Sequence, residues 1–462
     1  MAASVSTEAC APAAAGGGRR PARRSAAATI DRVIAEIDRL MAEQVDAIIH
    51  HPRFQRLEAA WRGLAWLVAG ADDSRTIKIR VLSLSWSALV RDFERSVEFD
   101  QSALFNKIYS SEFDMPGGEP FGIVVADYEP TIHPRDVAAL RELASVGAAA
   151  FCPIVLGCSP ALFQLDSFAQ FAPHLDVTGL FNSPGYRGWQ AARRNDDCRF
   201  LAIALPRVLF RLPYRADGTR TDGFVYNEAA HGGAAERWLW GNAAYAFAAT
   251  TIRSFAAYGW FADLRGAGAG RSAGGLVDRL PSPHFPTDRA GIALRAPIEV
   301  ALSERHEREL ADLGFMPLMP VRLTQHTAFY SNQSFHDSAR YDQPAARNNV
   351  RLAAILQQVL CASRFAHFLK VIVRDKIGTF ASADDCQRQL SDWIAGYCMA
   401  NDAGSEQLKA TYPLRDARIE VKEVPGRPGH YACVAHLQPQ FQLDEINAVF
   451  RLVTVLQEAR AA

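Results

Sequence analysis

The sequence has no excess of either charge and little lysine. Lysine plus arginine and aspartate plus glutamate each total 50 among 462 residues. A chain without net charge is not drawn to nucleic-acid phosphates or to anionic bilayers, so nucleic acid is not an expected partner. Only six of the 50 basic residues are lysine, which favours forked arginine contacts with carboxylates at interfaces.

Cysteine pairs and long apolar runs are also missing. The eight cysteines form no CxxC pair, which indicates free thiols in a reducing compartment, most of them as small core residues. No apolar run reaches the roughly 18 residues that span a bilayer, and no apolar signal segment lies near the start. The sequence therefore predicts a soluble, cytoplasmic protein that does not insert into a membrane.

One stretch, GAGAGRSAGG at residues 266–275, raises the question of a nucleotide site. A Walker loop requires glycine at 265 and lysine at 271, where the chain has Arg265 and Arg271. The stretch also follows a predicted helix, whereas the dinucleotide-binding glycines follow a strand. A flexible connection is the favoured interpretation, and an NTPase that uses this glycine loop is kept as an alternative.

A second candidate for chemistry lies where a predicted buried strand ends. Asp127 ends the apolar run at 121–127 and Glu129 lies two residues further on, and such carboxylates can serve as acid and base. With Arg207 they would form the composite site of a cytoplasmic enzyme. No companion motif supports this, so capping of the following turn is the simpler interpretation. We therefore expect no catalytic residue, cofactor or metal site.

Hydrophobic patterning predicts a mixed α/β fold. Short apolar runs at 121–127, 152–157 and 200–205 are typical of buried strands, and apolar and basic residues alternate over 77–81 like a further strand. Helical patterns cover 136–150, 234–258, 345–376 and 384–398. A chain of this length is expected to form two or three lobes.

The ends of the chain differ from this body. Residues 1–28 are predicted to be a disordered Ala/Gly/Arg tail, and residues 29–70 an N-terminal helical docking region that begins with Thr29 as N-cap. The α/β body is assigned to 71–400, with a surface lobe near 260–300, and a hairpin with a helix to 401–462. One apolar stripe of the first helix is expected to contact another subunit: Ile30, Val33, Ile34, Ile37, Leu40 and Met41.

The C-terminal hairpin has two alternating strands around the turn PGRPG. Two strands alone are marginal in water, so further strands are needed, and neighbouring chains can add them by β-augmentation. The first strand comprises Arg418, Ile419, Glu420, Val421, Lys422, Glu423 and Val424. The second comprises Tyr431, Ala432, Cys433, Val434, Ala435, His436 and Leu437.

Six blocks, taken in order, resemble one family over residues 30–453. They are LEAAWRGLAWLV at 57–68, LFNKIYSSEFDMPGGEPFGIVVADYE at 104–129, LPRVLFRLPY at 205–214, WLWGNAAYAFA at 238–248, SRFAHFLKVIVRDKIGTF at 363–380 and YPLRDARIEVKEVPGRPGHY at 412–431. In sequence and spacing these blocks resemble the large subunit of the type VI secretion contractile sheath, the TssC/VipB family.

The resemblance implies a multi-lobed contractile-sheath fold related to phage tail sheaths and a structural, non-enzymatic role. Family members pair with a small sheath subunit (TssB/VipA-like) and with copies of themselves in a helical lattice around a tube of Hcp hexamers. They attach to a baseplate, and the separate AAA+ ATPase ClpV recycles them. The resemblance also implies that strands around the C-terminal hairpin are exchanged between neighbouring subunits.

Overall fold

The computed structural model describes residues 20–71, 76–115, 117–216, 223–224, 226–228, 238–267, 273–283, 295–337, 354–375, 383–399, 406–423, 431–440 and 450–456. The contacts within the chain divide it into two units. One comprises residues 1–55 with 213–233, and the other 56–212 with 234–462.

In the first unit, a long helix α1 (Arg20–Ile49) starts earlier than predicted. Thr29 is inside the helix and is not its N-cap, and residues 20–28, which we expected to be disordered, are helical. Pro21 lies in the first turn, where its missing N–H removes no helical hydrogen bond, and the alanines at 26–28 are strong helix formers. The other end of α1 is tied to residues 226–228. His50 Nε2 lies 2.9 Å from Glu228 Oε1, and the Tyr226 hydroxyl donates to the Asp46 carboxylate.

The second unit is built around a six-stranded sheet in the order β1-β2-β3-β7-β8-β6. The first four strands are parallel and the last two are antiparallel to their neighbours. The strands are β1 (Val124–Ala126), β2 (Ile154–Gly157), β3 (Leu201–Leu205), β6 (Leu276–Val277), β7 (Phe315–Pro320) and β8 (Thr327–Phe329). The three apolar runs that predicted buried strands are thus confirmed as β1, β2 and β3.

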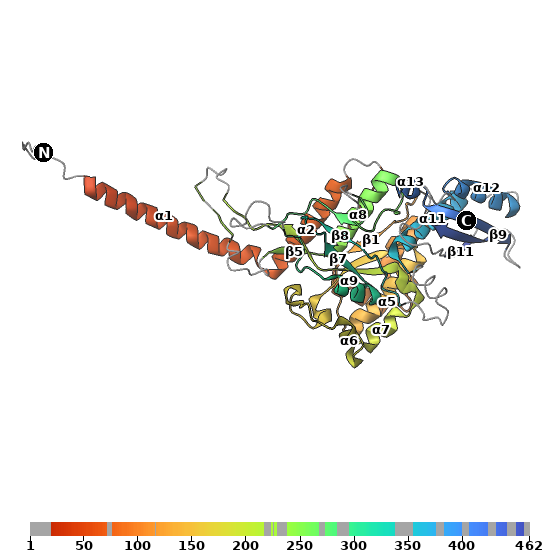
Figure 1. Cartoon of the computed structure of the whole chain (residues 1–462), viewed down its shortest axis with the longest axis horizontal. Helices are drawn as coiled ribbons and strands as arrows, with labels where there is room; N and C mark the ends of the chain where they lie inside the picture. The colour runs from red at the N-terminus through yellow and green to blue at the C-terminus, as the bar shows by residue number, and fades with distance from the viewer. Residues whose placement is uncertain are drawn as a thin grey trace, which may run out of the picture. The chain divides into compact units, whose positions relative to one another are not determined.

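Both faces of this sheet are covered by helices. Along β3, Leu201 and Ile203 point into one hydrophobic cluster and Ala202 and Ala204 into another. Helices α5 (Pro134–Ala149), α7 (Arg187–Arg193) and α9 (Glu304–Asp312) lie on the first face, and α2 (Pro52–Ala71) and α8 (Ala243–Tyr258) on the second (Figure 1). Strands buried on both faces read as continuous apolar runs, which explains why the sequence revealed them.

Shorter elements complete this part of the unit. They are α3 (Trp86–Arg95), η1 (Phe99–Gln101), α4 (Ala103–Phe105), η2 (Asn106–Asp114), η3 (Pro160–Phe163), η4 (Phe168–Gln170), α6 (Val177–Phe181), η5 (Pro184–Tyr186), η6 (Asp196–Phe200), β4 (Val208–Arg211) and β5 (Leu239–Gly241).

Two predicted elements differ from the structure. Residues 77–81, expected to be a strand, have no regular secondary structure and pair with no strand among the described residues. The helix expected over 234–258 begins only at Ala243, because residues 239–241 form β5 and pair with β4. Asn242 sets the boundary: its side chain accepts the Ala244 N–H at 2.8 Å and so caps α8.

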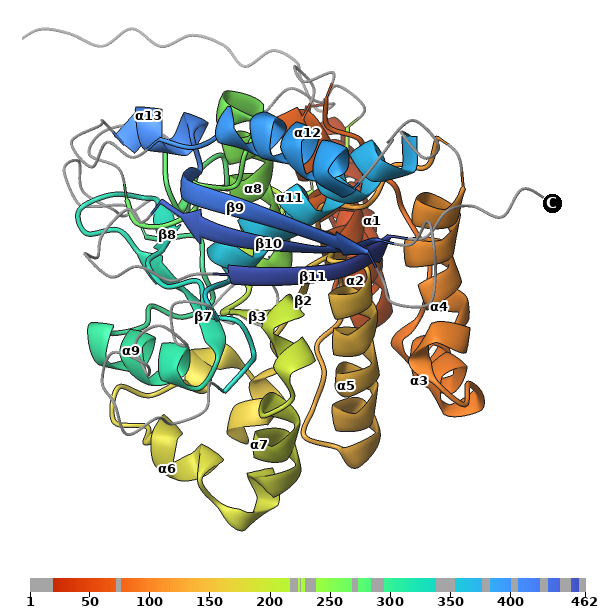
Figure 2. The same cartoon turned by 90° about the vertical axis from the view of Figure 1, so that its right-hand side faces the viewer.

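The C-terminal part has its own sheet and its own core. Helices α11 (Leu356–Asp375), α12 (Ala383–Ala395) and α13 (Glu406–Thr411) precede strands β9 (Leu414–Glu423), β10 (Tyr431–Pro439) and β11 (Phe450–Leu456). In Figure 2, α11 passes behind the three strands and α12 runs along β9. The predicted helices at 345–376 and 384–398 and the hairpin are confirmed where these residues are described. The third strand, β11, was not predicted.

Candidate functional site

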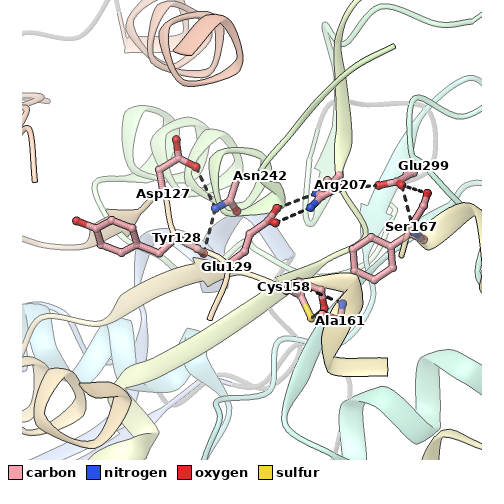
Figure 3. Close-up of polar contacts among 11 residues, drawn as sticks. Asp127, Tyr128, Glu129, Cys158, Ala161, Ser167, Arg207, Asn242 and Glu299 are labelled. Atoms are coloured by element: carbon pink, nitrogen blue, oxygen red, sulfur yellow. Dashed lines mark hydrogen bonds and ion pairs between the residues drawn. The ribbon is translucent and has the colours of Figure 1, made fainter. Parts of the chain in front are cut away.

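A chain of polar contacts crosses the ends of the parallel strands. Glu129 follows β1 and Arg207 follows β3, and the arginine donates to both carboxylate oxygens, from Nε at 2.8 Å and from Nη2 at 2.6 Å (Figure 3). Arg207 Nη1 also lies 3.9 Å from Glu299 Oε2. Glu299 Oε1 in turn accepts the Ser167 hydroxyl at 2.7 Å and the Phe168 N–H at 3.1 Å. The structure therefore brings Glu129 and Arg207 together as the sequence suggested.

Asp127 is engaged elsewhere. Its Oδ1 accepts the Asn242 amide at 3.2 Å and its Oδ2 accepts the Tyr245 hydroxyl at 3.2 Å, both from the start of α8. Burial raises the pKa of Asp127, and these two hydrogen bonds oppose the rise. Burial likewise raises the pKa of Glu299, while hydrogen bonding to Ser167 and the charge of Arg207 lower it.

This arrangement is better suited to holding the strands than to moving protons. Both oxygens of Glu129 are held by a guanidinium, and an arginine cannot take up a proton from its partner. The two carboxylates that the sequence proposed as an acid and base pair are therefore bound to different groups. Among the described residues, no cluster of three or more His, Cys, Asp or Glu side chains has a geometry that could hold a metal ion.

The ends of the glycine-rich stretch are held in place, contrary to the prediction of a flexible connection. Gly266 and Gly274 have positive φ values of 77° and 66°, and the Gly275 N–H donates to the Gly266 carbonyl at 2.9 Å. A Cβ on Gly275 would lie 2.2 Å from the Phe329 carbonyl oxygen. These three glycines are thus required by backbone conformation and close packing. The loop's Gly268 and Gly270 lie outside the described residues.

The C-terminal sheet presents one buried and one open face. Alternate residues of the two predicted interaction strands point into the cluster shared with α11 and α12: Ile419, Val421, Cys433, Ala435 and Leu437. The other face carries a charged row on β9, where Arg418 and Lys422 lie 3.1 and 3.5 Å from Glu420. Side chains of only one face are therefore available to another chain. Val424 lies outside the described residues.

The two edges of this sheet also differ. On β9, the Val421 N–H donates to Gln387 Oε1 of α12 at 2.9 Å, and Leu414 forms a parallel bridge with Cys398. The outer side of β11 pairs with no strand in the described part of the chain. Gln387 and β11 are features that sequence reasoning missed. The alternating FRLVTVL at 450–456 was the available signal for β11.

The apolar stripe of α1 is exposed over its predicted length. The side chains of the stripe are 43 to 60% exposed: Ile30, Val33, Ile34, Ile37, Leu40 and Met41. Nearer the end of the helix, Ile49 is buried. Across the described ranges, no helix is both long enough and apolar enough to cross a bilayer.

Two domain families of known proteins match nearly the whole chain. Residues 31–336 match the EvpB/VC_A0108 tail sheath N-terminal domain, and residues 345–456 match the EvpB/VC_A0108 tail sheath gpW/gp25-like domain. Helices α11 and α12, which share the core of the C-terminal sheet, lie within the second of these matches.

Over 437 residues, the chain is 40% identical to the type VI secretion system sheath protein TssC1 of Pseudomonas aeruginosa, with 94% of this chain and 87% of that protein covered. A cryo-EM structure of the anti-feeding prophage baseplate aligns over 84% of this chain and 82% of its own, at 10% identity and a TM-score of 0.36. The resemblance seen in the six sequence blocks is confirmed. The chain belongs to the TssC/VipB family, the large subunits of the type VI secretion contractile sheath.

Proposed function

We propose that this chain polymerises with a small sheath subunit of the TssB/VipA type, and with further copies of itself, into a helical sheath around an Hcp tube. Contraction of that sheath would drive the tube into a target cell. The observation that carries the proposal is 40% identity to a type VI sheath protein over 94% of the chain. Assembly on a baseplate, recycling by ClpV and a cytoplasmic location follow from the same relationship.

The C-terminal sheet supports assembly by strand addition. Its buried face is already filled by α11 and α12, and its β9 edge is bonded to α12 through Val421 and Gln387. Neither edge strand pairs with a further strand among the described residues, but the β9 edge is the one that carries the bond to α12. Backbone groups on an unpaired edge pair readily with another chain. We therefore place the inter-subunit strand beside β11, with the charged face of β9 available for side-chain contacts.

Helix α1 supports a second contact. A stripe of six apolar side chains at helical spacing is exposed, whereas a solvated helix normally carries polar residues all round. Burying such a stripe against an apolar helix of the small subunit or of a neighbouring copy would remove it from water. We therefore propose that these six side chains form a docking surface: Ile30, Val33, Ile34, Ile37, Leu40 and Met41.

A sheath subunit of this kind needs no active site of its own. Its work would come from the free-energy difference between extended and contracted lattices, in which rigid bodies rotate while strand-sharing contacts keep neighbours connected. The Glu129–Arg207 pair fits this role, because it joins strand ends within one rigid body. ATP would be hydrolysed by the recycling ATPase alone.

Co-expression with the small sheath subunit tests the proposal. The lysate is centrifuged at high speed and the pellet is examined by negative-stain electron microscopy. The proposal predicts that both subunits sediment together as long hollow tubules. A chain that stays soluble and separate from the small subunit, or that hydrolyses ATP by itself, would contradict it.

A further inference from the structure

A cavity of about 350 Å³ lies in the second unit, away from the polar contacts of the strand ends. Its walls are α8, α11 and two segments, residues 76–80 and 118–123. The lining is largely aromatic and aliphatic: Ile77, Phe121, Ile123, Ile252, Phe255, Phe261, Phe368 and Val371. A cavity of this size and character can take up one or two apolar side chains.

The cavity also contains a cation, Arg364, that pairs with no carboxylate of the described residues. The Arg364 guanidinium lies 4.5 Å from the centroid of the Phe368 ring and 5.8 Å from that of Phe255. Its Nε is buried and has no hydrogen-bond partner, and no carboxylate of the described residues forms an ion pair with it. His367, which is 1% exposed, lines the same cavity, and its Nδ1 is likewise unpartnered. Buried polar groups are normally satisfied, so two unsatisfied ones at one cavity point to a missing ligand.

The charges at the cavity favour an acidic ligand. Lys78, Arg80 and Arg364 line it, and Glu119 is the one acid among the lining residues. Of these cations, Lys78 pairs with Glu119 and Arg80 pairs with Glu112. Arg364 is therefore the cation left for a carboxylate from outside.

One wall of the cavity is a segment without regular secondary structure. Residues 77–83 form no helix or strand, and none of their backbone N–H or C=O groups bonds to a described residue. Their side chains include the exposed Ile79, Val81 and Leu82, with 37, 68 and 51% exposure. The β-type alternation of this segment was the reason for predicting a strand there. A segment with strand sequence, backbone groups that bond to no described residue, and exposed apolar residues is suited to pairing with another strand.

We propose that residues 77–83 and this cavity form a docking site for an extended, acidic and apolar segment of another sheath subunit. The segment would add as a strand along 77–83, place an apolar side chain among Phe121, Phe255 and Phe261, and place a carboxylate on Arg364. A peptide strand is expected because the backbone groups of residues 77–83 bond to no described residue. An acidic strand is expected because Arg364 pairs with no described carboxylate. This inference rests on the proposed assembly, because it needs a neighbouring subunit.

Hydrogen–deuterium exchange tests the docking site directly. Amide exchange of residues 77–83 is compared between the isolated chain and purified tubules formed with the small subunit. We expect exchange to slow by about tenfold or more in the tubules. In the same tubules, a photo-crosslinker at Leu82 should capture a segment of another subunit that contains an Asp or Glu near the crosslinked residue.

Two variants and a control test whether the slowed exchange arises from docking at residues 77–83 and the cavity. Val81→Pro removes an N–H that bonds to no described residue, so it should leave the isolated chain's unfolding midpoint unchanged and abolish the protection. Arg364→Leu should weaken docking by about 10- to 100-fold, the worth of a charged hydrogen bond. Arg322→Leu, at an 87% exposed side chain paired with Glu304, should have no effect on either measurement.

The possible outcomes distinguish a failure of the docking site from a failure of the proposed sheath function. Tubules in which residues 77–83 stay unprotected, or in which Leu82 crosslinks only to its own chain, would overturn the docking site and leave the sheath function standing. Failure to form tubules at all would overturn both. Protection that survives Val81→Pro and Arg364→Leu would also contradict the docking site.

Discussion

Arg207 holds both carboxylate oxygens of Glu129, with N–O distances of 2.8 and 2.6 Å. The two residues follow β1 and β3, which lie on either side of β2 in the sheet. The pair therefore bridges the end of β2. Each side chain is 28% exposed, so the pair is only partly screened by water.

Replacing Arg207 with Met should destabilise the chain more than replacing Glu129 with Gln. The first change leaves Glu129 and Glu299 without their cation, and removing one partner of such a pair costs about 3 kcal/mol or more of unfolding free energy. The double variant Arg207→Met/Glu129→Gln should recover part of the loss, because the two sites are coupled. Urea unfolding followed by circular dichroism measures all three. A loss below about 0.5 kcal/mol for Arg207→Met would show that the bridge is not structural.

His367 should make the chain sensitive to mild acid. Burial, with smaller contributions from the charges of Arg364 and Lys370, lowers its pKa from 6.5 to about 3, although the hydrogen bond to the Ala150 carbonyl at 3.0 Å opposes this. Above pH 6.5 the ring is neutral in both states and the full stability is present. Below that pH the unfolded chain binds the proton first, so the unfolding free energy falls by about 1.4 kcal/mol per pH unit.

The variant His367→Gln should lack this loss. Urea midpoints of both proteins at pH 7.5, 6.5, 5.5 and 5.0 provide the comparison, and the gap between them should narrow as the pH falls. A constant gap over this range would mean that His367 titrates alike in the folded and unfolded chain.

Gly275→Ala should destabilise the chain, because a Cβ there would lie 2.2 Å from the Phe329 carbonyl oxygen. We expect a loss of about 1–3 kcal/mol, as for other substitutions that overpack a site. Gly188 in α7 is the matched control. A Cβ at that position meets nothing within 4 Å, so Gly188→Ala should be neutral or stabilise by up to about 1 kcal/mol. Equal thermal midpoints for the two variants would restore the interpretation of the loop as a flexible connection.

Acidic substitutions on the α1 stripe should block association without unfolding the chain. Ile37 and Leu40 are 49 and 48% exposed, so Asp at either position costs little in the isolated chain. We expect each substitution to reduce co-purification with the small subunit by about tenfold, since burying an unpaired charge is costly. Ala35→Asp introduces the same charge on the opposite side of the helix and should co-purify normally. Equal behaviour of all three variants would exclude the stripe as a docking surface.

Tubule formation should survive loss of the Gln387 side chain that bonds the β9 edge, but it should not survive disruption of the β9 backbone. Gln387→Ala removes the acceptor of the Val421 N–H and should cost about 1 kcal/mol while leaving sedimentable tubules. Val421→Pro removes the same bond and also disrupts the backbone of a strand whose side chain is buried. We expect it to abolish tubules. Tubules formed by Val421→Pro would show that β9 is not part of the assembly.

Sequence patterns predicted the elements whose burial is uniform. β1, β2 and β3 are covered on both faces, so each appears as an uninterrupted apolar run. The start of α8 was misplaced because Trp238 and Leu239 fit a helical stripe, while β5 pairs with β4, a distant segment. Residues 77–81 show the converse case: local alternation favours a strand, but no described segment pairs with it.

The candidate sites likewise divide into contacts that the sequence suggested and contacts that depend on distant parts of the fold. The sequence analysis named Glu129 and Arg207 together as part of one alternative site. Both residues follow strands of the parallel sheet, whose ends meet at one edge, and the structure brings them into contact. The attachment of Asp127 to Asn242 and Tyr245 depends on where α8 begins, and that boundary was wrong. Gln387 and the unpaired Arg364 could not be found from local sequence, since their meaning depends on what lies beside them in the fold.

A cryo-EM reconstruction of tubules formed by this chain and the small sheath subunit would show directly whether subunits join by strand addition at the C-terminal sheet. We expect a helical lattice in which this three-stranded sheet continues into a strand of a neighbouring subunit beside β11. Tubules in which no strand crosses between subunits at this sheet, or preparations that contain no polymer, would contradict it.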